Sequence, residues 1–462
     1  MFEASTYVAR RTKLQQQFKH GLLLFIGNND SPMNYKDNTY HFRQDTSFLY
    51  YWGIDDPELA AVIDADAGTH TVYGDDFTID DIVWRGPQPT IAERAARAGV
   101  TKTATRTDLA KVLGDAVRQG RRIHYLPQYR ADNVQLVKTL LGICPEAVNA
   151  HASVSLVKAV VAQRAYKSAE ELAEIELALE VSYEMHTLAM KIARPGMYER
   201  EVAGAIAGLV ESHGRQLSFP IIFSVHGETL HNHYHGNRMA AGQMAVNDCG
   251  ANSPLQYASD LTRTIPIGGK FVGPQRDLYQ AVLRAHKKAL AAAKPGVKWM
   301  DVHLLACRSL AEDLKAIGCM KGDLDAAVRE GAHAMFFQCG LGHMMGYDVH
   351  DMEGLGEQHV GYDATVTRST QFGLKSLRMG RALEPGFVMT VEPGIYMIPT
   401  LMDKWRAEGK FTDFLNYDAI DKFRSFGGIR VEDDIVITEA GHRILGKRVP
   451  IEMEEVEALA SL

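Results

Sequence analysis

The sequence predicts an α/β N-terminal domain followed by an α+β domain with a pseudo-twofold internal repeat. The chain has 462 residues, and because soluble domains usually contain roughly 100–200 residues, two domains are the natural expectation. Strand-like and helix-like stretches alternate through roughly the first 150 residues, as in an α/β unit. Farther along, Arg194-Pro-Gly-Met197 recurs as Lys294-Pro-Gly-Val297. This recurrence suggests a duplicated helix–Pro-Gly–helix unit.

The N-terminal part has clear strand and helix signals. Apolar, bounded runs at 21–27, 59–66, 70–75 and 123–127 are typical of strands, and residues 91–100 and 107–120 are typical of helices. The aromatic-rich segment 40–53 is expected to pack in a core or at an interface, since aromatic side chains are enriched in both places. We therefore expect a first domain over residues 1–164.

A long helix is expected to open the second domain, residues 165–462. Ser168-Ala-Glu-Glu171 has the S-x-x-E pattern of a capping box. Arg194-Pro-Gly196 is expected to end this helix. Each Pro-Gly copy is followed by another helix-like stretch, 201–213 in the first and 301–317 in the second. Two copies of one unit in a domain favour a site between its halves. One apolar face of the first helix is formed by Leu172, Ile175, Leu179, His186 and Met190.

Composition excludes several classes of protein. Lys and Arg total 50 against 57 Asp and Glu, for a net charge of −7, which argues against a nucleic-acid-binding protein. The five cysteines form no C-x-x-C pair, which indicates a reducing compartment. The N-terminus lacks a signal-peptide apolar region, and the apolar run 21–26 is much shorter than the roughly 20 residues that span a bilayer. We expect a soluble cytoplasmic protein with no membrane partner.

The first candidate site residues are two aspartates. Asp248 ends an apolar run, and Asp260 opens the next strand after an Asn-Ser-Pro turn. A hairpin of this kind can bring the two carboxylates side by side, and Thr262 and Thr264 would share the face of Asp260. The alternative is that both aspartates only cap turns.

A histidine and a glutamate follow in two further segments. His343 lies in a glycine-rich loop, Gly340-Leu-Gly-His343, where a single histidine would more often be structural. Glu392 ends a buried apolar strand, and Pro393 prevents further strand pairing. A glutamate in that place is costly unless it is paired or bound to metal.

The last candidates alternate along a strand near the C-terminus. In Gly428-Ile-Arg-Val-Glu432, the two-residue period places Arg430 and Glu432 on one face. The alternative is an Arg–Glu ladder on an exposed face.

The chemistry of these residues is informative when they are taken together. Four carboxylates and one imidazole, with no thiolate, form an oxygen-rich ligand set suited to Mn²⁺ or a similar ion. Four carboxylates are too much negative charge for one divalent ion, so two ions roughly 3.5–4 Å apart fit better. Such a pair would supply hydroxide at neutral pH and stabilise an oxyanion during amide hydrolysis.

These motifs resemble the pita-bread metallopeptidase family of aminopeptidase P and prolidase, enzymes that cut Xaa-Pro bonds. The resemblance covers essentially the whole chain, including the segment FRQDTSFLYYWGIDDPELAAVID in the N-terminal part. It implies a pita-bread fold for the second domain and two divalent ions, expected to be Mn²⁺. Asp260 and Glu432 would bridge them, and Glu392 would shuttle a proton. The implied metal ligands are Asp248, Asp260, His343, Glu392 and Glu432.

The resemblance also assigns substrate-handling residues. His233 and His350 match histidines that donate to the scissile carbonyl or the tetrahedral intermediate, and Arg430 matches an arginine that orients a metal-binding carboxylate. Relatives in this family are commonly oligomeric, so we expect a homodimer or homotetramer. His226, His231 and His235 have weaker claims to a role.

The sequence departs from the family pattern at a few positions. Cys339 stands where the family usually has a histidine, so we expect altered pH or substrate dependence but retained metal. Residues 373–378 and the insertion 399–427 are closer to prolidases, whereas the C-terminal tail and the N-terminal pattern are closer to bacterial aminopeptidase P. We expect an Xaa-Pro aminopeptidase, with an Xaa-Pro dipeptidase as the alternative. A non-catalytic pita-bread binding module is disfavoured because all five ligands are present.

Overall fold

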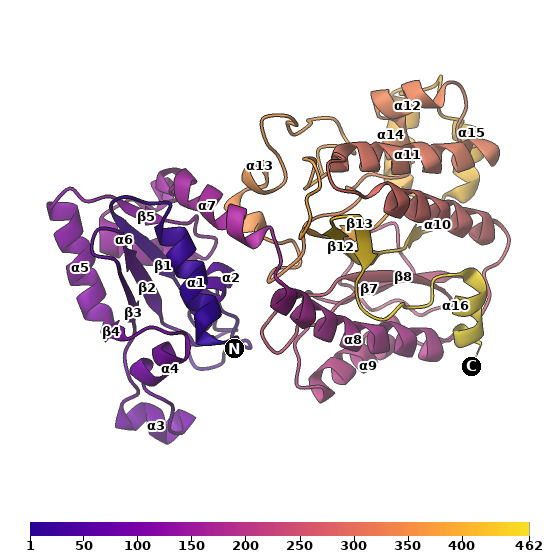
Figure 1. Ribbon diagram of the computed structural model, residues 1–462. Helices are drawn as coiled ribbons and strands as arrows, with labels where there is room; N and C mark the ends of the chain where they lie inside the picture. Colours follow the sequence, from indigo (N-terminus) through magenta and orange to yellow (C-terminus); the bar gives the residue numbers. More distant parts are fainter. Residues whose placement is uncertain (462) are drawn as a thin grey trace. The chain divides into compact units, whose positions relative to one another are not determined.

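The computed structural model describes residues 1–461 and divides them into two compact units (Figure 1). The first unit contains Met1–Arg164 together with the short segment Glu353–His359, and the second contains the rest of the described chain. The returning segment includes a 3-10 turn, Glu353–Leu355, and most of helix α13 (Glu357–Val360). Within residues 1–461, no helix combines the length and the apolar character that crossing a membrane would require.

The first unit is built on a five-stranded mixed sheet of order β4-β3-β2-β1-β5. The central strand β1 pairs antiparallel with β2 and parallel with β5, and its five residues are all buried. These strands confirm the strand expectations for this region, because each apolar run becomes a sheet strand. The strands are β1 (Leu22–Ile26), β2 (Ala60–Asp64), β3 (Thr69–Tyr73), β4 (Lys102–Ala104) and β5 (Ile123–Tyr125).

Helices α2, α3, α4 and α5 of the first unit begin at a side-chain cap. Thr90 and Thr105 each form a capping box with the residue three positions on, so the expected helices at 91–100 and 107–120 are confirmed. The aromatic-rich segment contains α2, whose residues from Ser47 to Trp52 are buried. The helices are α1 (Ala4–Gln15), α2 (Thr46–Trp52), α3 (Ile79–Arg85), α4 (Ile91–Arg97), α5 (Arg106–Arg118), α6 (Ala131–Leu141) and α7 (Val154–Arg164), with 3-10 turns at Pro145–Ala147 and Asn149–His151.

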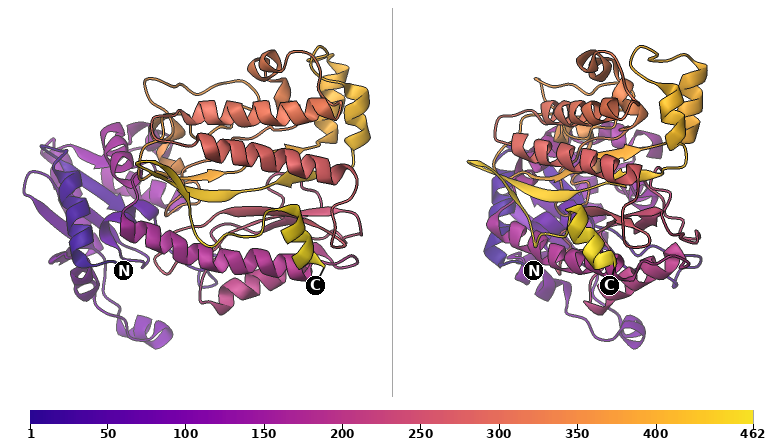
Figure 2. Two further views of the ribbon diagram at one scale, coloured as in Figure 1. Left: turned by 45° about the vertical axis from the view of Figure 1, so that its right-hand side comes forward. Right: turned by 90° about the vertical axis from the view of Figure 1, so that its right-hand side faces the viewer.

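The second unit opens with the expected long helix. The Ser168 side chain accepts a hydrogen bond from the Glu171 backbone amide, and the Glu171 carboxylate accepts one from the Ser168 backbone amide. This pair of hydrogen bonds confirms the capping box. In Figures 1 and 2 the strands of this unit lie between the helix pair α8 and α9 and the pair α10 and α11. The helices are α8 (Ala169–Ile192), α9 (Glu199–Ser212), α10 (Pro274–Ala292), α11 (Trp299–Ala316), α12 (Leu324–Glu330), α14 (Pro399–Ala407), α15 (Tyr417–Ile420) and α16 (Met453–Ala460), with 3-10 turns at Ala332–Met335 and Asp421–Phe423.

Three small sheets form the centre of the second unit. Their orders are β6-β7-β8, β13-β12-β9 and β10-β11, and every pairing within them is antiparallel. A single bridge between Thr262 and Glu432 joins the first sheet to the segment after β11. The strands are β6 (Ile222–Ser224), β7 (Met244–Cys249), β8 (Leu261–Pro266), β9 (Val388–Val391), β10 (Gly394–Tyr396), β11 (Gly428–Arg430), β12 (Asp433–Thr438) and β13 (Gly441–Ile444).

The two Pro-Gly segments occupy equivalent places, as the internal repeat predicts. Gly196 and Gly296 both have left-handed backbones, with φ of 91° and 82°, which glycine adopts without strain. The Gly196 amide donates to the Met239 carbonyl at 2.7 Å, and the Gly296 amide donates to the Leu383 carbonyl at 2.8 Å. β7 and β9 follow Met239 and Leu383 at the same spacing, so Asp248 and Glu392 fall at matching positions in the two halves.

Candidate active site

The hairpin of β7 and β8 brings the two aspartates together. Asp248 pairs with Thr262 in the strand register, and Asp260 immediately precedes β8. Because side chains alternate along a strand, Asp248, Asp260 and Thr262 share one face. The Asp260 amide donates to the buried carboxylate of Asp434 at 3.1 Å, which fixes the backbone at this point. The two carboxylates therefore meet on the inner face of the sheet, as the sequence predicts.

Glu392 and His343 come from neighbouring segments. Glu392 directly follows β9, and its amide donates to the Leu341 carbonyl at 2.8 Å. The glycine before His343 permits this close approach, because a Cβ on Gly342 would come within 2.0 Å of the Thr390 carbonyl oxygen. His343 Nε2 consequently lies 3.5 Å from Glu392 Oε1 and also 3.5 Å from Asp260 Oδ2.

Arg430, the last residue of β11, and Glu432, two positions later, complete the site. Arg430 is buried and forms an ion pair with Asp248, donates through Nε to Thr262 Oγ1 at 3.0 Å, and donates through Nη1 to Tyr396 Oη at 3.1 Å. The Thr262 hydroxyl in turn donates to Glu432 Oε2 at 2.6 Å. Arg430 and Glu432 therefore lie on a buried face, and the alternative of an exposed Arg–Glu ladder is wrong.

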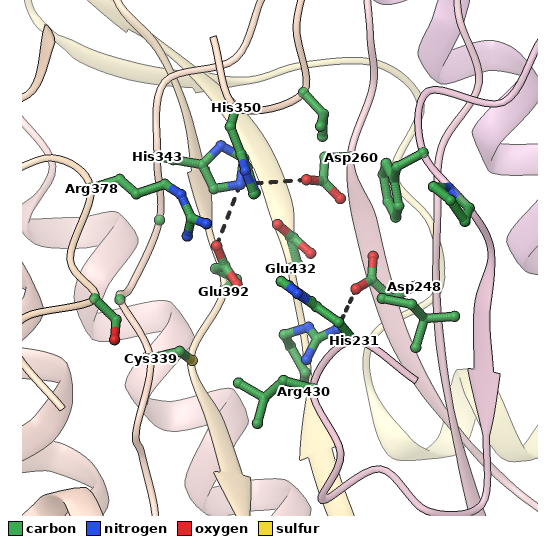
Figure 3. Close-up of a pocket in the computed structure, with 18 of the residues that line it drawn as sticks. His231, Asp248, Asp260, Cys339, His343, His350, Arg378, Glu392, Arg430 and Glu432 are labelled. Carbon is green, nitrogen blue, oxygen red and sulfur yellow. Dashed lines mark hydrogen bonds and ion pairs between the residues drawn. The ribbon is translucent and has the colours of Figure 1, made fainter. Parts of the chain in front are cut away.

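The five candidate metal ligands and Arg430 line one cavity of about 180 Å³ (Figure 3). Figure 3 shows His343 between Asp260 and Glu392, and Arg430 directed at Asp248. The His350 ring lies against the His343 ring, with centroids 4.3 Å apart. The cavity brings together all eight residues singled out from the sequence, namely His233, Asp248, Asp260, His343, His350, Glu392, Arg430 and Glu432.

The electrostatics of the cavity are dominated by crowded, buried negative charge. Burial raises the pKa values of Asp260 and Glu432 well above their usual range, and neighbouring carboxylates raise them further. Burial also raises the pKa of Glu392 to about 7, although the charges of His343 and Arg430 act in the opposite direction. The protein's own groups therefore leave this cluster short of positive charge.

The donor set fits divalent metal ions. One ligand atom from each of Asp260, His343 and Glu432 lies within 4.8 Å of the other two. Asp248 Oδ1 is buried and has no hydrogen-bond partner within residues 1–461, so it could bind a cation. Carboxylate oxygens with one imidazole suit Mn²⁺, Zn²⁺ and similar ions. Bound cations would offset the negative charge that raises the carboxyl pKa values.

The cavity also contains residues to which sequence reasoning assigned little or no role. His231 lines the wall, and its pKa is lowered by burial and by the positive charge of Arg430. Arg378 lines the cavity and, in Figure 3, extends toward Glu392. Arg378 ends the motif Gly373-Leu-Lys-Ser-Leu-Arg378, which in the sequence indicated only a similarity to prolidases. His226 and His235 are absent from the cavity lining.

Cys339 lies in the cavity wall at the position where a histidine was expected. Its Sγ lies 3.9 Å from Tyr396 Oη, which also accepts the hydrogen bond from Arg430. Burial and the charge of Glu392 raise the pKa of the Cys339 thiol to about 12. The thiol is therefore protonated at neutral pH and is a poor nucleophile there.

Buried ion pairs outside the cavity hold its walls in place. The Arg263 guanidinium is fully buried, contacts Asp433 at 2.6 Å and donates to the Glu432 carbonyl at 2.6 Å. Lys167 and Asp351 form a second buried pair at 2.7 Å, next to His350 in the chain. These contacts fix the backbones that present Glu432 and His350 to the cavity.

A buried cluster of carboxylates with one imidazole, placed between two halves of a duplicated α+β unit, defines the class of metal-dependent hydrolases. The chain belongs to metallopeptidase family M24, whose model matches residues 173–439. Residues 7–124 match the aminopeptidase P N-terminal domain. The expected family and two-part architecture, with a pita-bread second domain, are confirmed.

Relatives by sequence include two kinds of enzyme. The human Xaa-Pro dipeptidase is 32% identical over 447 residues, which cover 95% of this chain and 88% of the human protein. The Xaa-Pro aminopeptidase of Escherichia coli (strain K12) is 30% identical over 464 residues, which cover 97% and 96%. The two levels of identity are too close to separate the two activities.

Solved structures match over the whole chain. Zinc-substituted E. coli aminopeptidase P in complex with product has a TM-score of 0.81 at 27% identity, with 100% of this chain and 98% of that chain covered. The Pseudomonas aeruginosa aminopeptidase PepP has a TM-score of 0.82 at 26% identity, with the same coverage. The likeness therefore extends through both units and is not confined to the motifs around the site.

Proposed function

We propose that this chain hydrolyses the Xaa-Pro peptide bond and releases the N-terminal residue from peptides with proline in second position. The observation that supports this most strongly is the convergence of Asp248, Asp260, His343, Glu392 and Glu432 in one buried cavity. Relatives named for Xaa-Pro cleavage, one a dipeptidase and one an aminopeptidase, match almost the whole chain.

The same five residues would hold two divalent ions, and we propose Mn²⁺ because the ligands are mainly carboxylates. Asp260 and Glu432 would be shared by both ions. Ions bound in this way polarise a substrate carbonyl and lower the pKa of water. Thr262 would keep Glu432 in position through its 2.6 Å hydrogen bond, and Arg430 would do the same for Asp248 through their ion pair.

Glu392 is the residue best placed to move a proton. Its side chain is 18% exposed, more than that of Asp260 or His343, so it reaches the open part of the cavity. The Thr390 hydroxyl lies 3.4 Å from Glu392 Oε1 and restrains the carboxyl group. A carboxyl group held in this place can both accept and return a proton during the reaction. We assign Glu392 to accept the proton of the attacking water and to return it to the departing imino nitrogen of proline.

His350 and His233 line the cavity and would donate hydrogen bonds to the substrate. A single donor to a developing oxyanion contributes about 2.7–4 kcal/mol to transition-state stabilisation. His350 lies against His343, which places it beside the proposed metal ligands and the reacting carbonyl. His233 belongs to the His-rich segment 231–235, which reaches the same cavity through His231.

The proposed activity is tested with a panel of peptides and added Mn²⁺. Xaa-Pro dipeptides, Xaa-Pro-Yaa oligopeptides and matched Xaa-Ala peptides are incubated with the full chain, and the products are identified by mass. We expect cleavage only before proline. A chain that binds Mn²⁺ but cleaves none of the peptides would overturn the proposal and favour a non-catalytic binding module.

A second candidate, an Xaa-Pro dipeptidase, is favoured by Arg378. This guanidinium lines the cavity, and its positive charge contributes to the lowered pKa of His231. In an Xaa-Pro dipeptide the proline carries a free carboxylate, which a guanidinium binds well through paired hydrogen bonds. In a longer peptide that carboxylate is replaced by an amide.

Arg378→Met separates the two substrate classes. If Arg378 binds the proline carboxylate, the variant should lose affinity for dipeptides and keep its activity on tripeptides. The loss should be about tenfold or more, since hydrogen bonds to charged groups contribute about 1.5–3 kcal/mol. Arg368→Met, an exposed position in the same segment, is the matched control. Equal losses on both substrates would exclude the carboxylate role.

A cytoplasmic location and a homodimer or homotetramer stay predictions.

A further inference from the structure

A second cluster of metal-binding side chains is buried in the catalytic unit, on α11 and the 3-10 turn Ala332–Met335. His303 and Cys307 lie on one face of α11, because residues four positions apart are neighbours on a helix. His333 faces them from the turn. One ligand atom from each of the three residues lies within 4.8 Å of the others. None of the three lines the catalytic cavity.

The cluster is buried and poorly satisfied. Cys307 and His303 are fully buried and His333 is 3% exposed. In the described chain His303 Nδ1 has no hydrogen-bond partner, and the His333 ring nitrogens have none apart from the nearby Val328 carbonyl. Natural proteins rarely bury polar nitrogens in this way, and each such group calls for an explanation such as an ion. Apolar side chains of similar size would fill the same space without that penalty.

The geometry and chemistry suit a thiophilic metal ion. His303 Nε2 lies 3.4 Å from Cys307 Sγ. Two ligands of a tetrahedral zinc ion, with bonds of about 2.0–2.3 Å, are separated by roughly 3.5 Å. A neutral imidazole keeps one lone pair for a metal, and zinc accepts thiolate and imidazole ligands together.

We propose that His303, Cys307 and His333 form a second metal site that holds one zinc ion. Binding breaks the Cys307 S–H bond, releases that proton to solvent and forms a zinc–sulfur bond. The ion would join α11 to the turn that precedes the segment of Cys339 and His343, with a water molecule as its fourth ligand. Thiolate and imidazole ligands distinguish this site from the carboxylate-rich cavity.

Cobalt substitution tests the proposal independently of peptidase activity. The full chain is produced in zinc-depleted medium with added Co²⁺, and its absorption spectrum and bound cobalt are measured. A cobalt–thiolate charge-transfer band is expected in the wild type, and the same band is expected in Asp260→Asn, in which the catalytic site is altered. The band should be absent from Cys307→Ser, with bound cobalt lower by one equivalent per chain.

Cys339→Ser is the matched control, because Cys339 is the thiol of the catalytic cavity. This variant should keep the band and the full amount of cobalt. His333→Gln, checked for folding by circular dichroism, provides a second route if Cys307→Ser does not fold, and it should also bind one equivalent less. A wild type without the band, a band that survives Cys307→Ser or His333→Gln, or a band lost only in Cys339→Ser would overturn the proposal.

Discussion

Replacing Glu392 with glutamine should abolish activity and, in the metal-free protein, increase stability at alkaline pH. Glu392 lies among other carboxylates with 18% of its side chain exposed, and its pKa is raised from 4.5 to about 7, chiefly by desolvation. Glutamine has nearly the same shape but carries no charge. The ionisable carboxyl group of Glu392 therefore lowers the stability of the folded chain at the place where its proton chemistry is needed.

The size and the pH window of this effect follow from the pKa. Below pH 4.5 the carboxyl group is protonated in both the folded and the unfolded chain, so it imposes no charge penalty. Between about pH 4.5 and pH 7 the unfolded chain has released this proton while the folded chain still holds it, so stability falls across that window and levels off above it. Each pKa unit corresponds to about 1.4 kcal/mol, so the full loss by pH 8–9 is about 3 kcal/mol. Glu392→Gln removes this loss.

Thermal unfolding of chelator-treated protein measures the effect. The variant should melt several degrees above the wild type at pH 8.5, since 1 kcal/mol shifts Tm by roughly 2–4 °C in a large domain, and at pH 4.5 the two should nearly coincide. Glu408→Gln, an exposed position just after α14, is the control and should show no such pH-dependent gain. A variant that is less stable than the wild type at pH 8.5, or equally shifted at both pH values, would refute the reasoning.

Three further predictions concern the metal and substrate contacts. Asp260→Asn should lose metal and activity together, and retention of two equivalents of Mn²⁺ by elemental analysis would contradict its bridging role. His350→Ala should lower kcat by about 10²–10³-fold with unchanged metal content, whereas a metal-depleted variant would make His350 a ligand. Thr262→Val removes the hydroxyl that joins Glu432 to Arg430. It should weaken metal affinity by about 10–100-fold in calorimetric titration, and an unchanged affinity would show that Glu432 needs no such support.

Local patterns determined much of the fold. The capping box at Ser168, the apolar runs that became β1, β2 and β3, and the repeated Pro-Gly segments depend on short-range interactions, which a sequence displays directly. The candidate site residues were also visible, because a carboxylate at the end of a buried strand, such as Glu392, conflicts with its surroundings unless it has a function.

Other features depended on contacts between distant segments. The exposed-ladder alternative for Arg430 and Glu432 was open in the sequence, and burial against Thr262 excluded it. Arg378 gained a candidate role only when the fold brought it to the same cavity as Glu392. The sequence assigned no role to His303 and His333, since nothing in the chain shows that a turn will face α11.

The sequence by itself determined which residues have metal-binding and acid–base chemistry and in which local elements they lie. The tertiary structure decided which of them share a cavity, which charges are buried together and which ring nitrogens are left without partners. The physical reason is that propensity, capping and periodicity act over a few neighbouring residues. Burial and electrostatic coupling arise only when β7, β9 and β11 pack around one point.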